Sequence, residues 1–187
     1  MSGAELNFVR KGSGPPLLLL HGLGGSIVVW KPVLGLLAAE RDVIAVDLPG
    51  FGSSPMAGGA AGERPAAMAA TLAELCASLG APRPHVAGNS LGAWVALEMA
   101  KAGAAASVAA ISPAGMWRQA LGPSRHTAHE VGNRLRPLVR ALARTPRGRS
   151  LILRTTMARP DLMPSEDAVA LVSSYLESPG YTAANDA

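Results

Sequence analysis

Residues 86–100 read V-A-G-N-S-L-G-A-W-V-A-L-E-M-A, and they place Ser90 between two glycines, at positions 88 and 92. The apolar residues before Ser90 favour a buried strand, and those after it follow the spacing of a helix. A sharp turn between such elements strains the serine, and side chains at the two glycine positions would collide with the adjacent backbone. The hydroxyl is then exposed where the N–H of Leu91 points at the start of the helix. We predict that Ser90 is a nucleophile and that this N–H stabilises negative charge beside it.

The composition indicates a globular protein with a sizeable core. The sequence has 187 residues, of which 49% are hydrophobic and 16% charged. No apolar run approaches the roughly 18 residues of a membrane span, and residues 1–14 lack the apolar segment of a signal peptide. We therefore expect a cytoplasmic protein that makes no use of a membrane. The single cysteine, Cys76, lies among alanines and leucines of a helical pattern, which is typical of a small buried side chain rather than a nucleophile.

Positive charge is concentrated in one segment. The formal net charge is +4 at pH 7, but residues 118–159 contain ten arginines and a single acidic residue. Part of this segment has the spacing of a helix with two faces, Leu135, Leu138, Val139 and Leu142 on one and Arg136, Arg140 and Arg144 on the other. We predict that the arginine face is solvated. No aromatic residues alternate with the arginines, so we expect no nucleic-acid binding, whereas an acidic partner is left open.

Short apolar runs alternate with helical segments along the first 115 residues. Four runs bounded by turn residues fit strands buried on both faces, and a further alternating run fits an edge strand. The expected strands are residues 5–10, 17–20, 43–46, the stretch around residue 86, and 108–111. The expected helices are residues 30–40, 65–79 and 91–102. This alternation predicts an α/β fold with a doubly wound, mostly parallel sheet over residues 1–115, followed by helical segments over residues 116–187.

The loops after the strands of such a sheet meet at one edge and carry its chemistry. The loop after the first buried strand is rich in glycine and can supply a second N–H toward Ser90, which we assign to Leu23. The neighbouring residues predicted to contact a substrate are Gly22, Gly24, Asn89 and Trp117. A dinucleotide site is not expected, because Ile27 stands where its fingerprint requires a third glycine. We also expect no metal and no other cofactor.

Four motifs follow one another along the chain: HGLGG at 21–25, DLPGFGSS at 47–54, GNSLG at 88–92 and SPAG at 112–115. Together they resemble the α/β-hydrolase family, in the branch with a helical cap that contains esterases and carbon–carbon bond hydrolases. The resemblance implies that Ser90 is the nucleophile and that the N–H groups of Leu23 and Leu91 form the oxyanion hole. A serine, where dehalogenases and epoxide hydrolases of this fold carry aspartate, implies an ester, thioester, lactone or C–C substrate. His21 and Asp47 are implied to be structural.

The sequence departs from the family in the residues that activate the serine. The family places an acid and a histidine after the serine, on loops beyond the cap. His85 precedes Ser90 by five residues, at the wrong end of its strand, and His126 and His129 are left as candidate bases at the start of the cap. The other acids of the cap segment are typical of a loop and a helix N-terminus: Asp161, Glu166 and Asp167.

We therefore interpret the sequence as the amino-terminal two-thirds of a serine hydrolase, with an incomplete core at residues 1–115 and a cap segment at residues 116–187. It is expected to act on a small, apolar acyl substrate through an acyl-enzyme at Ser90. The alternative is a non-catalytic binding protein that retains the serine turn and has lost its base.

Overall fold

The chain forms two compact units in the computed structural model. Unit 1 comprises Met1–Arg118 with Ser178–Ala187, and unit 2 comprises Gln119–Glu177. The structure describes residues 6–56, 64–116, 131–154 and 156–181. The two units are considered separately below.

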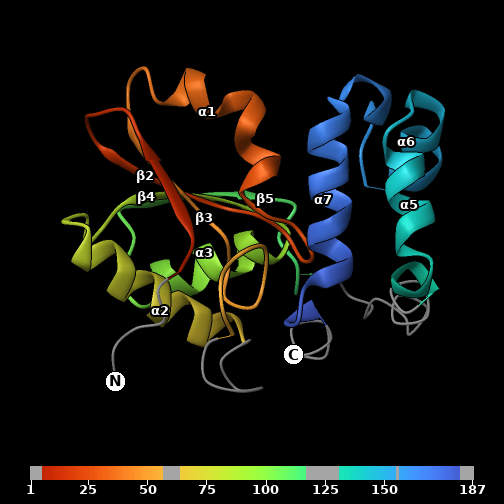
Figure 1. The fold of residues 1–187 in the computed structure, drawn as a ribbon. Helices are drawn as coiled ribbons and strands as arrows, with labels where there is room; N and C mark the ends of the chain where they lie inside the picture. Colours follow the sequence, from red (N-terminus) through yellow and green to blue (C-terminus); the bar gives the residue numbers. More distant parts are fainter. Residues whose placement is uncertain (1–5, 57–63, 117–130, 155, 182–187) are drawn as a thin grey trace. The chain divides into compact units, whose positions relative to one another are not determined.

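Unit 1 is built on one five-stranded sheet in the order β1-β3-β2-β4-β5 (Figure 1). Only β1 runs antiparallel to its neighbour, and the other pairs are parallel. The strands are β1 Phe8–Lys11, β2 Pro16–Leu20, β3 Asp42–Val46, β4 His85–Asn89 and β5 Ser107–Ile111. The mostly parallel α/β sheet that the sequence predicts is confirmed.

Helices cover both faces of this sheet. Figure 1 shows α1 on one face and α2 and α3 on the other. The helices of unit 1 are η1 Ile27–Trp30, α1 Lys31–Leu37, α2 Pro65–Ser78 and α3 Leu91–Lys101. Because β2, β3, β4 and β5 are parallel, their carboxyl ends meet at one edge of the sheet.

The core of unit 1 is formed by the central strands and the helices on them. The apolar runs Leu18–Leu20 and Val43–Val46 are completely buried, as a parallel sheet between two helical layers requires. Leu19, Val43 and Ala45 pack against residues of η1 and α1. On α2, Cys76 is buried, and loss of solvent raises the pKa of its thiol to about 11. The thiol is therefore protonated and packs as a small apolar group.

The strand β5 differs from the other parallel strands, because four of its five residues are exposed. The Ile111 side chain keeps 46% of its surface accessible, although β-branched residues of a parallel strand are ordinarily buried. Among the described residues of unit 1, β5 pairs with β4 alone and is the edge of the sheet. An exposed apolar edge is a surface on which another strand can pair.

The described part of unit 2 contains helices and no strands. These are α5 Arg136–Ala143, α6 Pro146–Leu153, η2 Pro160–Leu162 and α7 Ser165–Glu177. Its core contains Ala143, Leu153, Ala168, Val172 and Leu176. The hydroxyl oxygen of Thr145 accepts a hydrogen bond from the N–H of Gly148 (3.1 Å) and so caps α6.

The predicted orientation of α5 is only partly right. Arg144 is exposed as predicted, and Val139 packs against the core of unit 2. Arg140, however, donates from Nε to Oγ of Ser173 (2.8 Å) and from Nη2 to Oε1 of Glu177 (2.6 Å), so this part of the arginine face contacts α7. Arg136 also reaches Glu177, at 3.2 Å. Leu135 and Leu138 of the apolar face are instead 48% and 55% exposed. The polar side chains of α7 that attract the arginines are more than 30 residues away in the sequence, which helical spacing alone does not show.

A lysine on the exposed edge is predicted to suppress self-association. Ala109→Lys places a charge on β5 without filling a buried site, so the free energy of unfolding changes by less than about 1 kcal/mol. Light scattering at increasing protein concentration measures the effect. Ala39→Lys adds the same charge at an exposed position outside the sheet and is the control. Equal suppression by both variants would assign the effect to net charge and contradict the role of the edge.

Candidate active site

Ser90 occupies the turn between β4 and α3 with an unusual backbone. Its φ is 54° and its ψ is −113°, a combination that residues with a side chain rarely adopt. The N–H of Ser90 donates to the carbonyl oxygen of Ile111 (3.0 Å). Its own carbonyl oxygen accepts from the N–H groups of Ala93 and Trp94 (3.1 Å each) and of Ala114 (3.0 Å). A helix, a strand end and a loop therefore fix this conformation together.

The glycines around Ser90 permit a close approach of backbone segments. A Cβ at position 92 would lie 2.5 Å from the carbonyl oxygens of Leu20 and His21, so the first turn of α3 rests on the end of β2. A Cβ at position 88 would overlap the carbonyl group of Gly92. The turn between β4 and α3 therefore has room only for glycine at these two positions.

The loop after β2 lies directly against the serine. A Cβ at position 22 would come within 3.1 Å of Cβ of Ser90 and within 3.0 Å of Oδ1 of Asn89. Gly22, Leu23, Asn89 and Ser90 are each partly accessible. The structure thus brings together the predicted nucleophile and the loop that carries the predicted second donor.

Two backbone donors near Ser90 have no acceptor in the described part of the chain. Among the described residues, no hydrogen bond uses the N–H of Leu23 or that of Leu91. Leu91 is the first residue of α3, where the N–H groups of a helix have no acceptor within the helix. Free N–H groups at a helix N-terminus favour negative charge beside them.

His21 holds the loop after β2 in place. The imidazole is fully buried, and its Nε2 accepts from the N–H of Leu48 (2.9 Å). The proton is therefore on Nδ1, which donates to the carbonyl oxygen of Gly22 (2.8 Å). Burial lowers the pKa of His21, so the ring is neutral at pH 7. Both nitrogens are engaged in this loop, and neither is available to Ser90.

Asp47 is likewise engaged by the loops around it. Its carboxylate accepts from Nδ2 of Asn7 (2.7 Å), from the N–H of Ile27 (2.7 Å) and from the N–H of Ser53 (2.9 Å). These bonds join the loop after β2 to the loop after β3. The carboxylate fixes the backbone below the serine turn and has no contact with Ser90 among these bonds.

Of the remaining candidate bases, only His85 belongs to the described part of the chain. His85 begins β4, at the end of the strand opposite Ser90, and its Nδ1 lies 2.8 Å from Oγ of Ser107. His126, His129 and Trp117 lie outside the described residues. The three acids considered from the sequence all belong to unit 2: Asp161 in η2, and Glu166 and Asp167 in the first turn of α7.

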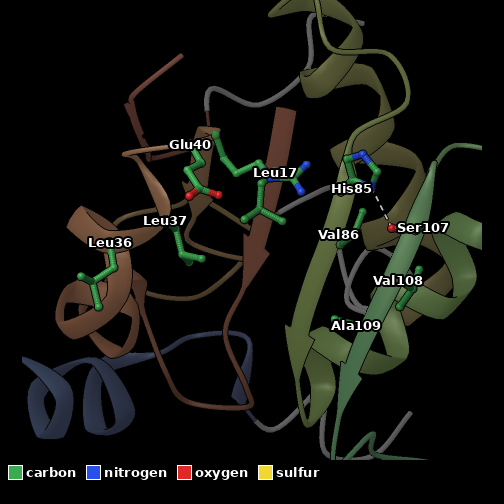
Figure 2. A pocket seen from close by; sticks show the side chains of 10 residues that line it. Leu17, Leu36, Leu37, Glu40, His85, Val86, Ser107, Val108 and Ala109 are labelled. Atoms are coloured by element: carbon green, nitrogen blue, oxygen red, sulfur yellow. Dashed lines mark hydrogen bonds between the residues drawn. The ribbon is translucent and has the colours of Figure 1, made fainter. Parts of the chain in front are cut away.

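A cavity of about 400 Å³ lies at the opposite edge of the sheet from Ser90. Figure 2 shows Leu36 and Leu37 of α1 on one side and Val86, Val108 and Ala109 on the other, with the His85–Ser107 hydrogen bond at the amino ends of β4 and β5. Its lining includes residues at the end of α1 and exposed residues of β5. Because chemistry in this fold belongs at the carboxyl ends of the strands, the cavity is not the candidate site.

Two further properties concern the described residues only. None of their helices combines the length and the apolar character needed to cross a membrane. No three of their His, Cys, Asp or Glu side chains are grouped so that they could hold a metal ion.

A mostly parallel sheet between helical layers, with a glycine-flanked serine turn after a central strand, defines the α/β-hydrolase class of fold. The chain belongs to the alpha/beta hydrolase family, whose family model matches residues 17–185. The resemblance found in the sequence motifs is thereby confirmed.

Relatives in this family catalyse different hydrolytic reactions. The chain is 43% identical over 91 residues to a pimeloyl-[acyl-carrier protein] methyl ester esterase of Aeromonas hydrophila subsp. hydrophila. The matched region covers 49% of this chain and 34% of the esterase. The chain is 41% identical over 98 residues to a fluoroacetate dehalogenase of Burkholderia sp, covering 51% of this chain and 32% of the relative.

The fold extends over nearly the whole chain. The crystal structure of naproxen esterase from Bacillus subtilis superimposes with a TM-score of 0.69 at 19% identity, over 95% of this chain and 59% of the esterase. The 187 residues thus span three fifths of that structure, and the sequence matches span about a third of the two relatives.

Replacement of His21 is predicted to change how stability depends on pH. The pKa of His21 is lower in the folded protein than in the unfolded chain, so below about pH 6.5 the unfolded chain binds more protons. From pH 7.5 to 5.5 this site alone then lowers the free energy of unfolding by up to about 1.4 kcal/mol. His21→Gln removes that dependence and, by leaving buried partners unpaired, costs about 2 kcal/mol at pH 7.5.

Urea unfolding of the wild type and of His21→Gln at both pH values measures this difference. His85→Gln is the control, because His85 is only half-buried and contacts the partly exposed end of the sheet. The same loss of stability on acidification in wild type and His21→Gln would contradict the assignment.

Proposed function

We propose that this chain carries the nucleophile and the oxyanion hole of a serine hydrolase that cleaves ester-like or C–C bonds of a small apolar acyl substrate. The observation that carries the proposal is the strained, partly accessible Ser90 beside the unbonded N–H groups of Leu23 and Leu91. Backbone strain of this kind persists where several contacts impose it, and it occurs frequently at active sites.

In the proposed reaction, Oγ of Ser90 attacks the carbonyl carbon of the substrate as a base removes its proton. The carbonyl oxygen becomes an oxyanion and accepts hydrogen bonds from Leu23 and Leu91. Collapse of this intermediate expels the leaving group, which takes the proton, and leaves an acyl group on Ser90. Water, deprotonated by the same base, then releases the acid and restores the serine.

A hydrogen-bond donor that is already in position stabilises the transition state more strongly than water does, because it does not reorganise as the charge develops. Loss of one oxyanion donor in such sites costs about 10²–10³ in kcat. Gly22 and Asn89, which contact the serine turn, and Gly24 in the same loop are proposed to border the acyl group. Trp117 is proposed to do so as well, and residues 116–187 are proposed as the cap.

The base and the acid are proposed to come from polypeptide beyond these 187 residues. Two observations support this part of the proposal. Neither described histidine presents a nitrogen to Ser90, and the relatives and the solved structure are longer than the region they share with the chain. In addition, β5 is an edge strand with exposed residues, and a further strand could pair with it in the complete protein.

The ester class of substrate has support of its own. The esterase of Aeromonas hydrophila acts, by its name, on a methyl ester of an acyl group, and it shares 43% identity over a region that includes half of this chain. The relative named fluoroacetate dehalogenase is 41% identical to this chain, so a similar sequence identity also occurs with a reaction that removes a halogen. Serine at position 90 favours the ester, because a serine alkoxide forms an acyl-enzyme with a carbonyl substrate.

A non-catalytic binding protein is the second candidate. It is favoured by one observation, the lack of an available imidazole near Ser90 among the described residues. Such a protein would keep the serine turn for packing or for ligand binding, and it would not form an acyl-enzyme.

Labelling with a fluorophosphonate separates the two functions. The protein encoded by the complete gene is expected to label at Ser90, and Ser90→Ala is expected to abolish labelling, because the probe forms a bond with an activated serine. Ser107→Ala, at the other end of β5, is the matched control and should label as the wild type does. The 187-residue chain alone should label on the order of 10⁶-fold more slowly, as expected for a serine without its base.

Mass spectrometry of the labelled peptide identifies the modified residue. Absence of labelling in the complete protein would contradict the hydrolase and support the binding protein. A stop codon directly after Ala187 would contradict the missing base, whereas an in-frame continuation with an aspartate loop and a later histidine would support it.

A further inference from the structure

The turn that follows β5 contains a second strained residue. Ser112 has a φ of 47°, and among the described residues only Ser90 and Ser112 combine a positive φ with a side chain. Ser112 also precedes Pro113, whose ring restricts the backbone of the residue before it. We name residues 111–115 the β5 turn. Strain at an exposed serine persists only where neighbouring contacts require that conformation.

The β5 turn holds both polar backbone groups of Ser90. Upstream of Ser112, the carbonyl oxygen of Ile111 accepts from the N–H of Ser90 (3.0 Å). Downstream, the N–H of Ala114 donates to the carbonyl oxygen of Ser90 (3.0 Å). The chain must reverse within two residues to make both bonds to one amino acid, and the left-handed φ of Ser112 falls inside that reversal.

The β5 turn is also fixed to α3. A Cβ at position 115 would lie 2.9 Å from the indole ring of Trp94, so the backbone of Gly115 is in contact with this side chain. The N–H of Trp94 bonds to the same carbonyl oxygen of Ser90 (3.1 Å). Ser90 is thus held by α3 and the β5 turn, while the loop at Gly22 touches its Cβ.

We propose that Ser112 is a positioning residue for the nucleophile. Its left-handed backbone places the carbonyl of Ile111 and the N–H of Ala114 so that Ser90 stays at its strained φ and its hydroxyl keeps the geometry needed for attack. This inference rests on the proposed function of Ser90. The conformation of residue 112 is the relevant property, not its hydroxyl group.

Substitutions graded by their tolerance of a positive φ test this role in the complete protein. Glycine adopts this conformation freely, asparagine adopts it more readily than other residues, alanine less so, and β-branched valine least. Ser112→Gly and Ser112→Asn should keep kcat for p-nitrophenyl butyrate within about threefold. Ser112→Val should lower kcat and the rate of fluorophosphonate labelling by on the order of 10–100-fold, with KM within about twofold, because misplaced reacting groups slow the chemical step.

Ser107→Val is the matched control. It makes the same change at the first residue of β5, at the end of the strand remote from Ser90, where valine suits an extended backbone. It should leave kcat and labelling unchanged. Circular dichroism and the unfolding midpoint of each variant show whether it is folded.

Two results would overturn the inference. The first is a folded Ser112→Val with the kcat of the wild type. The second is a loss in Ser112→Gly as large as that in Ser112→Val, which would assign the effect to the hydroxyl. If Ser112→Val does not fold, the kcat values of Ser112→Ala and Ser112→Gly are compared. The inference then requires that Ser112→Ala has the lower kcat, and equal values would overturn it. A wild type that does not label would contradict the proposed function instead, which the Ser112 variants do not address.

Discussion

The backbone of Ser90 is the constraint on which the rest of unit 1 depends. A left-handed φ at a residue with a side chain costs about 1–2 kcal/mol, and four backbone hydrogen bonds with a net worth of about 1 kcal/mol each offset that cost. These bonds need β4, the end of β5 and the first turn of α3 within a few ångströms of one point. Glycine at positions 88 and 92 follows from that crowding, since a Cβ there would meet backbone. The strain at Ser90 is thus maintained by the sheet and not by the turn alone.

The buried polar residues of unit 1 support the other side of the same site. His21 and Asp47 satisfy N–H groups in the loops after β2 and β3, and they fix the loop that carries Leu23. Nearly all buried backbone N–H groups in proteins have an acceptor. Among the described residues, the N–H groups of Leu23 and Leu91 have none, and both belong to segments that meet at the strained serine. Under the proposed function, the site needs donors that are ordered yet unoccupied, and the buried imidazole and carboxylate would provide that order.

The sequence predicts the sheet and the serine turn because both depend on local patterns. Apolar runs between turn residues define the buried strands, and two glycines define the turn. The same reasoning is only partly right for α5, because periodicity shows which residues share a face but not which of them meet a partner. Arg136 and Arg140 find Glu177 across unit 2, whereas Leu135 and Leu138 remain exposed. The strain at Ser112 was missed because a Ser-Pro pair favours an extended backbone, and only the two bonds to Ser90 require otherwise. The predicted roles of Leu23, Gly24 and Asn89 stay predictions, and Trp117 lies outside the described residues.

The exposed β5 strand and the missing base have one physical explanation under the proposed function. Parallel strands are stable when both faces are covered, and catalytic loops follow the carboxyl ends of strands. A further strand beside β5 would cover the exposed Ile111, and its carboxyl end would lie at the edge of the sheet where Ser90 is found. The segment that completes the sheet would therefore also be suited to deliver a histidine. A non-catalytic protein requires no such link, since its sheet could be completed by a strand without any imidazole. Covering of β5 and activation of Ser90 should thus occur together in a hydrolase, whereas in a binding protein β5 would be covered without activation of Ser90.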